Sequence, residues 1–374
     1  MSWRQWSKTL YSLLRPGRRS GQSAFAHRRG QVTHVLILDG TMSSLTPGCE
    51  SNAGLSYKLL SEVAGCDLSV YYEAGMQWCD WRATADVMTG RGINHQIRRA
   101  YGYLASRYRP GDRVFLLGYS RGAYAVRSLA GVIDRVGLLR AEHATERNIV
   151  TAYRYYRAGG AGAAAAAFRA AHCHAEAPIE MLGVWDTVKA LGMRYALFSD
   201  WHRARHDFHN HALGPAIRHG YHALALDETR CAYTPVLWET PPGFDGRVEQ
   251  VWFRGTHGDV GGQLGGFEAA RPLANIALVW MLERAGALDL PLPRGWRARF
   301  ACDPAAPSVG TWRGWGKIML LRRARTIGAD PSERLHETVA GRELPGRPRS
   351  RSQAGLPVPR AAGPPVPPDR PAAG

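Results

Sequence analysis

The chain has 374 residues, a formal charge of +17 at pH 7 and six scattered cysteines without a C-x-x-C pair. This length can bury a large core, and the cysteine pattern excludes a zinc ribbon and a dense disulfide framework. No apolar run approaches eighteen residues and no signal peptide is recognisable, so we expect a cytoplasmic protein, or one exported by a signal-peptide-independent route.

The positive charge is concentrated at the two ends. Residues 1–31 hold seven Lys or Arg and no acid, and residues 341–374 hold six Arg and two acids. The ends therefore carry eleven of the seventeen charges, and residues 32–340 have a modest balance near +6. Basic tails bind many polyanions, so no specific nucleic acid is predicted and no protein partner is indicated.

Residues 1–31 are predicted to be a separate tail. Trp3, Trp6, Leu10 and Leu13 share one helical face among basic residues, which is typical of a helix lying on an anionic membrane. The alternative is a docked or disordered tail. Residues 341–374 are rich in Pro, Arg and Gly and are predicted to be disordered.

Residues 32–340 are predicted to form one domain that begins with alternating strands and helices. A near-continuous apolar run at 32–38 is typical of a strand buried on both faces. The elements that follow are a helix at 57–63, a strand at 68–72, a helix at 93–108 and a strand at 113–117. This alternation predicts an α/β fold, with a mostly parallel central sheet and helices on both faces.

The second half of the domain gives a less regular pattern. Its composition favours helix over 142–177, with a low-complexity surface insertion at 159–167, and strand over 178–188. The remaining elements expected are a helix at 212–226, a last strand at 248–255 and a helix at 272–285.

A G-x-S-x-G motif lies between the strand at 113–117 and a helical pattern that follows it. This context predicts a nucleophile elbow, in which Ser120 stands exposed at a sharp turn. Gly118 and Gly122 lack a Cβ and so let strand and helix approach each other. The alternative is a serine that only caps a glycine-rich helix.

A serine hydroxyl needs a base and a group that orients the base. Asp186 and His257 each follow a strand, in the chain order serine, acid, histidine that α/β hydrolases use. Asp227 and Asp259 are rival acids. Asp186 could instead cap a helix, and His257 could be a core histidine.

The oxyanion of an acyl-transfer intermediate is usually stabilised by two backbone N–H groups. We expect one from Arg121 and the other from the loop containing Gly40 and Thr41. Asp39 beside them either accepts hydrogen bonds that hold the loop or binds a cation.

Two other chemistries fit less well. A phosphatase of the haloacid-dehalogenase type needs an aspartate two residues before Asp39, where the chain has Ile37. A zinc site is suggested by five histidines, but no H-E-x-x-H occurs, so no metal and no cofactor are expected. The histidines are His172, His174, His202, His206 and His209.

Five ordered motifs together resemble the catalytic domain of type VI secretion phospholipase effectors. They are LILDGT (36–41), GYSRGAYAVRSLAG (118–131), GVWDTV (183–188), ALALDETR (223–230) and VWFRGTHGDVGG (251–262). The resemblance implies an α/β-hydrolase fold and a serine esterase or phospholipase, with Ser120, Asp186 and His257 as nucleophile, acid and base.

We therefore predict a serine hydrolase that cleaves carboxylic esters, with a phospholipid as the expected substrate. The basic, tryptophan-bearing N-terminus favours contact with anionic lipid. The alternatives are a soluble small-ester hydrolase and a catalytically silent hydrolase fold that serves as a binding protein.

Overall fold

The computed structural model describes residues 29–75, 91–188, 213–240, 247–312 and 319–339. Internal contacts divide the chain into Met1–Gln31 and Val32–Gly374, and the architecture below is that of the second unit. The amphipathic helix and the disordered tail expected at the two ends lie outside the described residues. In the described part of the chain, no helix is long and apolar enough to cross a membrane.

The core of the fold is a seven-stranded sheet in which every pairing is parallel, as predicted. The strand order is β2-β1-β3-β4-β5-β6-β7. The order reverses between β1 and β3, and open α/β sheets bind ligands beyond the carboxyl ends of strands at such a point. The strands are β1 (Thr33–Leu38), β2 (Leu68–Glu73), β3 (Arg113–Tyr119), β4 (Ile179–Trp185), β5 (Ile217–Ala225), β6 (Arg247–Phe253) and β7 (Glu333–Leu335).

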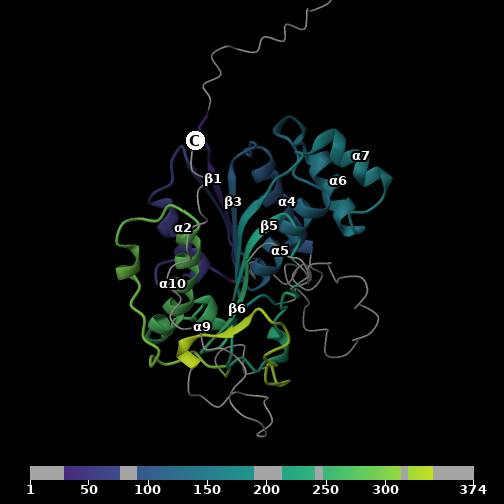
Figure 1. Cartoon of the computed structure of the whole chain (residues 1–374). Helices are drawn as coiled ribbons and strands as arrows, with labels where there is room; N and C mark the ends of the chain where they lie inside the picture. Colours follow the sequence, from purple (N-terminus) through teal and green to yellow (C-terminus); the bar gives the residue numbers. More distant parts are fainter. Residues whose placement is uncertain (1–28, 76–90, 189–212, 241–246, 313–318, 340–374) are drawn as a thin grey trace, which may run out of the picture. The chain divides into compact units, whose positions relative to one another are not determined.

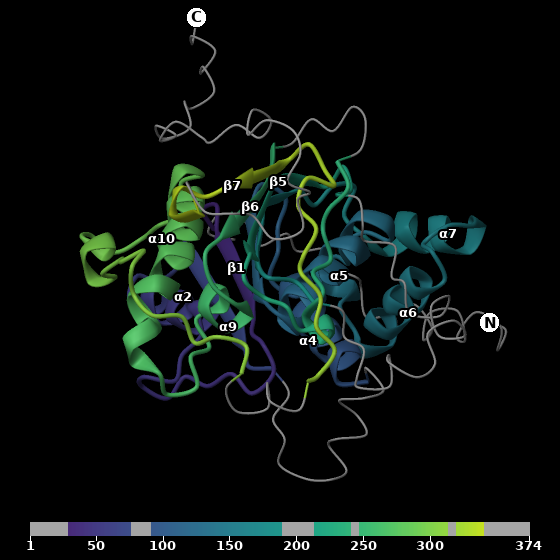
Figure 2. The ribbon, with the colours of Figure 1, turned by 90° about the horizontal axis from the view of Figure 1, so that it is seen from below.

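Helices cover both faces of the sheet (Figures 1 and 2). In β1, Val35 and Ile37 pack into the core under α2 and α10, while Leu36 and Leu38 pack into the core under α4 and α5. All four side chains are fully buried, which explains why the strand is apolar from Val35 to Leu38. One face carries α2 (Asn52–Ser61) and α10 (Arg271–Ala287); the other carries α4 (Arg91–Ala105), α5 (Arg121–Arg135), α6 (Glu146–Arg157) and α7 (Ala163–His172).

The expected helix at 212–226 is wrong, because this stretch contains β5 in the middle of the sheet. Its alanine and leucine favour a helix by intrinsic propensity, but pairing with β4 and β6 overrides that preference. Gly220 lies in this strand where there is little room for a side chain, since a Cβ there would lie 2.7 Å from a methyl of Leu213.

Two further expectations need correction. The helical stretch at 142–177 is interrupted by Gly159, Gly160 and Gly162, which all have positive φ. The insertion expected at 159–167 is only partly a loop, because α7 begins at Ala163 and buries Ala165. The strand after Val248 is not the last, since β7 pairs with β6 near the C-terminus.

Candidate active site

Ser120 lies between the end of β3 and the start of α5, at the reversal of strand order. Its φ of 57° and ψ of −119° are strained for a residue with a side chain. The backbone is held there because the Ser120 N–H donates to the Trp185 carbonyl at 3.0 Å. Strain that the surrounding structure maintains is typical of functional positions.

The glycines flanking Ser120 allow a close approach of strand and helix. A Cβ at Gly122 would lie 2.1 Å from the carbonyl oxygen of Leu38, and one at Gly118 would lie 2.7 Å from Val126. Gly40 is similarly tight, with its Cβ position 2.7 Å from the Tyr119 ring. The start of α5 therefore lies directly against the end of β1.

His257 is the first residue of the short helix α9 (His257–Gly261) and joins two of the predicted residues. Its Nε2 lies 2.8 Å from Ser120 Oγ, and its Nδ1 lies 2.6 Å from Asp186 Oδ2. A carboxylate only accepts, so Nδ1 carries the proton and the Nε2 lone pair faces the serine hydroxyl. In this state the imidazole can accept the serine proton.

Asp186 follows β4 and is fully buried, with a φ of 42°. Its Oδ1 accepts from the Ala225 N–H at 3.0 Å. The Arg325 guanidinium donates to both of its oxygens, at 2.6 and 2.9 Å. Burial alone would raise the pKa of Asp186, but Arg325 and His257 outweigh burial and hold this pKa well below its usual range.

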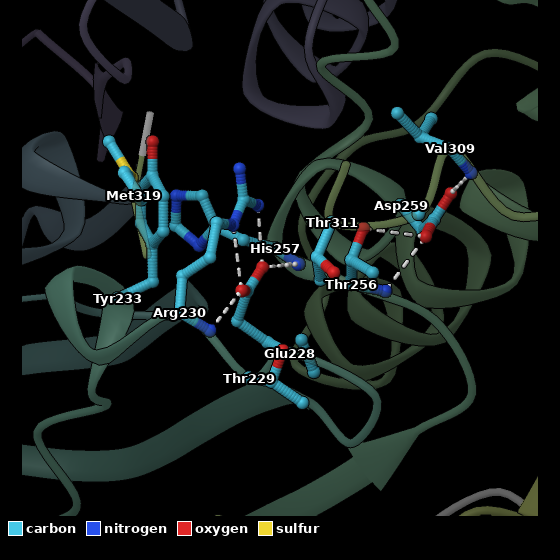
Figure 3. A network of polar contacts seen from close by, with 12 residues as sticks. Glu228, Thr229, Arg230, Tyr233, Thr256, His257, Asp259, Val309, Thr311 and Met319 are labelled. Carbon is cyan, nitrogen blue, oxygen red and sulfur yellow. Dashed lines mark hydrogen bonds and ion pairs between the residues drawn. The ribbon is translucent and has the colours of Figure 1, made fainter. Parts of the chain in front are cut away.

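The His257 ring is held by neighbours that the sequence did not reveal (Figure 3). Tyr233 stacks on the imidazole with ring centroids 4.5 Å apart, and the Arg230 guanidinium lies 4.3 Å from the Tyr233 centroid. Glu228 accepts from the His257 N–H at 3.1 Å and from Arg230 at 2.6 Å. Burial would raise the pKa of Glu228, but the hydrogen bonds from Arg230 outweigh burial and lower this pKa. Glu228 and Arg230 therefore form an ion pair beside His257.

The rival acids have other partners. Asp259 accepts from the Thr256 N–H and hydroxyl, at 2.7 and 2.8 Å, and from the Val309 N–H at 2.8 Å (Figure 3). It therefore caps α9. Asp227 accepts from the Gly255 N–H at 2.8 Å. The geometry favours Asp186 as the carboxylate that orients His257.

Asp39 is fully buried and holds the loop after β1. It accepts from the Ser51 hydroxyl at 2.6 Å, the Tyr72 hydroxyl at 2.8 Å and the Gly40 N–H at 2.6 Å. Burial raises the pKa of Asp39 more than these bonds lower it. The Gly40 N–H is thus engaged by Asp39, so within the loop expected to supply an oxyanion donor the Thr41 N–H is the better candidate.

The N–H groups of Thr41 and Arg121 remain as candidates for the expected oxyanion donors. Within the described ranges, neither amide has a hydrogen-bond acceptor. Arg121 is the first residue of α5, and first-turn amides of a helix have no intrahelical partner. An oxyanion hole formed by these two groups stays a prediction.

The two described histidines that were candidates for zinc ligands, His172 and His174, pack against aromatic rings. His172 packs against Phe168, and His174 packs against Tyr108. No group of three His, Cys, Asp or Glu in the described ranges could hold a metal ion. The other three histidines considered for zinc, at 202, 206 and 209, lie outside those ranges.

Two solved structures show a low similarity to this chain. A Tle1 effector bound to the VgrG spike of the Type 6 secretion system is 17% identical, covering 63% of this chain and 51% of that one, with a TM-score of 0.37. An uncharacterized protein from Pseudomonas aeruginosa is 15% identical, covering 80% of this chain and 51% of that one, with a TM-score of 0.40. The chain spans about half the length of each.

A curated relative, the uncharacterized protein YEL023C of Saccharomyces cerevisiae, is 26% identical over 244 residues. The match covers 58% of this chain and 34% of the relative, so the chain spans about a third of its length. Residues 33–284 match the family model for the catalytic domain of Tle1-like phospholipase effectors of the type VI secretion system. This match covers well over half of the chain and confirms the resemblance of the five motifs, so the chain belongs to the Tle1-like phospholipase effector catalytic-domain family.

Proposed function

We propose that the chain is a serine hydrolase in which Ser120, His257 and Asp186 act as nucleophile, base and acid. One observation carries the proposal: two hydrogen bonds, of 2.8 and 2.6 Å, link the three side chains in one line. They lie just beyond the carboxyl ends of β3, β6 and β4, where open α/β sheets build their sites.

The chemistry follows from the tautomer of His257. Ser120 Oγ attacks the ester carbonyl as its proton passes to Nε2, and Asp186 stabilises the imidazolium that forms. The oxyanion accepts from the N–H groups of Arg121 and Thr41. Nε2 then protonates the departing alcohol, and water, activated by the same nitrogen, hydrolyses the acyl-enzyme to free Ser120 and a carboxylic acid.

The substrate we propose is a phospholipid ester, because the chain belongs to a family of phospholipase effector domains. The basic residues 1–31 with their tryptophans support contact with an anionic membrane, where each Lys or Arg adds about 1 kcal/mol. An effector role would also require export.

Labelling by a fluorophosphonate probe tests the nucleophile. We expect wild-type protein to be labelled, and Ser120→Ala to lose both labelling and hydrolysis of p-nitrophenyl esters, by about 10⁴–10⁶-fold in kcat. Ser106→Ala is the control, because this exposed serine contacts only the Tyr103 carbonyl and the neighbouring Arg107 at the end of α4. A folded Ser120→Ala protein that keeps more than a tenth of the activity would contradict the assignment, and an unlabelled wild type would favour a silent binding protein.

Phosphatidylglycerol vesicles test the substrate. Their turnover is compared with that of soluble esters, for the full chain and for a chain lacking residues 1–31. We expect the truncation to reduce vesicle cleavage much more than cleavage of soluble esters. Equal effects on both substrates, or no cleavage of vesicles, would leave the small-ester hydrolase as the better description.

A further inference from the structure

The segment that carries Arg325 lies outside the residues that match the family model. The family model ends at residue 284, whereas residues 319–325 run beside the segment that follows β5 (Figure 2). The Arg323 N–H donates to the Thr229 carbonyl at 2.7 Å, and the Cys231 N–H donates to the Leu321 carbonyl at 3.0 Å. We refer to residues 319–325 as the strap.

Arg325 points from the strap into the site and is only 6% exposed. Its two terminal nitrogens bind both oxygens of Asp186. The same nitrogens donate to the carbonyls of Ala225 and Tyr233, each at 2.6 Å. The guanidinium therefore joins the acid to the end of β5 and to the residue that stacks on His257.

We propose that Arg325 is a positioning residue, which fixes the Asp186 carboxylate and sets how strongly that carboxylate stabilises protonated His257. This inference rests on the proposed function. A cation in contact with Asp186 offsets part of its negative charge, so the imidazolium gains less from the carboxylate than it would without Arg325. Without that cation the carboxylate would stabilise the imidazolium more strongly.

Several other ionisable groups surround the Asp186–His257 pair. They are present both in wild type and in the Arg325 variants. Tyr119 faces it from β3, buried His222 from β5, and Tyr233 with the Glu228–Arg230 ion pair from the segment after β5. Tyr233 also accepts from Arg325 through its carbonyl, so replacing Arg325 can move this ring as well as remove a charge. A shift in pH dependence that Arg325→Gln shows and Arg325→Lys does not share therefore reports the guanidinium charge.

The test compares pH profiles of kcat/KM for soluble esters in wild type, Arg325→Gln and Arg325→Lys. Gln removes the charge, and we expect it to move the acid limb up by roughly one to two pH units. Lys keeps the charge but cannot form two parallel bonds, so we expect a lower plateau with the limb nearly unmoved. Arg323→Gln is the control, because Arg323 is an exposed arginine of the same strap.

The downfield ¹H NMR signal of the His257 Nδ1 proton, titrated without substrate, gives a second reading of the same shift. If both the acid limb and the NMR titration are unchanged in folded Arg325→Gln, the proposal for Arg325 is overturned. This holds even where labelling of wild type shows that Ser120 is the nucleophile. If wild type shows no labelling and no turnover that depend on Ser120, the proposed function itself is wrong, and the role of Arg325 fails with it.

If Arg325→Gln does not fold, the double variant Asp186→Asn/Arg325→Gln decides. Loss of one partner leaves a buried unpaired charge, whereas loss of both does not. We expect the double variant to fold and to show a cooperative thermal transition that Arg325→Gln alone lacks. A double variant as unstable as the single one would mean that Arg325 only packs the strap, and the proposal would fail.

Discussion

Asp186→Asn replaces one carboxylate oxygen by an NH₂ group and keeps the shape of the side chain. The change falls at the end of the hydrogen-bonded chain of Ser120, His257 and Asp186. The amide oxygen would stay on the side of Oδ1, where the Ala225 N–H donates at 3.0 Å. The amide nitrogen would then take the place of Oδ2, 2.6 Å from His257 Nδ1. An NH₂ group donates, so it would require Nδ1 to accept and would place the imidazole proton on Nε2, facing Ser120.

The wrong tautomer cannot take the serine proton. We expect a loss of about 10²–10⁴ in kcat, which corresponds to about 3–5 kcal/mol of transition-state stabilisation. The lower bound applies if the imidazole still samples the correct tautomer at a modest cost. The assay is steady-state hydrolysis of a p-nitrophenyl ester at the plateau of the pH profile, with folding checked by circular dichroism.

Asp259→Asn is the matched control. Asp259 accepts four hydrogen bonds from Thr256, Ser308 and Val309, so its replacement should lower the free energy of unfolding by about 1–3 kcal/mol and change kcat less. A greater loss of rate in folded Asp259→Asn than in folded Asp186→Asn would refute the assignment of the acid.

Two further predictions concern packing and pH. Gly122→Ala should destabilise the fold by about 1–3 kcal/mol or displace α5, with a loss of turnover, because its Cβ would meet the backbone of Leu38; Gly65→Ala, whose Cβ has room, should be neutral in thermal melts and ester assays. Burial, then the nearby Arg127, lowers the pKa of His222 to about 3. Below about pH 6.5 the unfolded chain therefore binds a proton at His222 that the folded protein does not bind. The free energy of unfolding should then decrease as the pH falls, by up to about 1.4 kcal/mol per pH unit. His222→Gln should show a shallower fall in Tm between pH 7.5 and 5, and equal slopes would count against this source.

The parts of the site that could be predicted from sequence are those fixed by local chain geometry. A strand, G-x-S-x-G and a helix predict where Ser120 stands, and the close contacts of Gly118 and Gly122 explain the motif. Asp186 and His257 follow strands, and parallel strands bring their carboxyl ends to one edge of the sheet. The geometry therefore brings the three together, although their catalytic roles remain proposals.

The parts that were missed depend on contacts between distant segments. Arg325 lies 139 positions from Asp186 in a stretch without regular secondary structure, so no periodicity points to it. Glu228 and Arg230 lie within the motif at 223–230, but nothing in the sequence indicates that they contact the residue after the last predicted strand. The strand β5 was missed because burial between two strands, not intrinsic propensity, decides its conformation.

Two buried aspartates near Ser120 have pKa values shifted in opposite directions, which separates their roles. Asp186 contacts a cation and an imidazole, which lower its pKa, so it stays ionised and can stabilise a positive charge that forms on His257. Asp39 is surrounded by the hydroxyls of Ser51 and Tyr72, and burial raises its pKa. A carboxyl group whose charged form is disfavoured suits a structural role in the loop after β1 better than the binding of a cation. The two environments therefore support the proposed role of Asp186 in orienting His257, and they favour a structural role for Asp39 in the loop after β1.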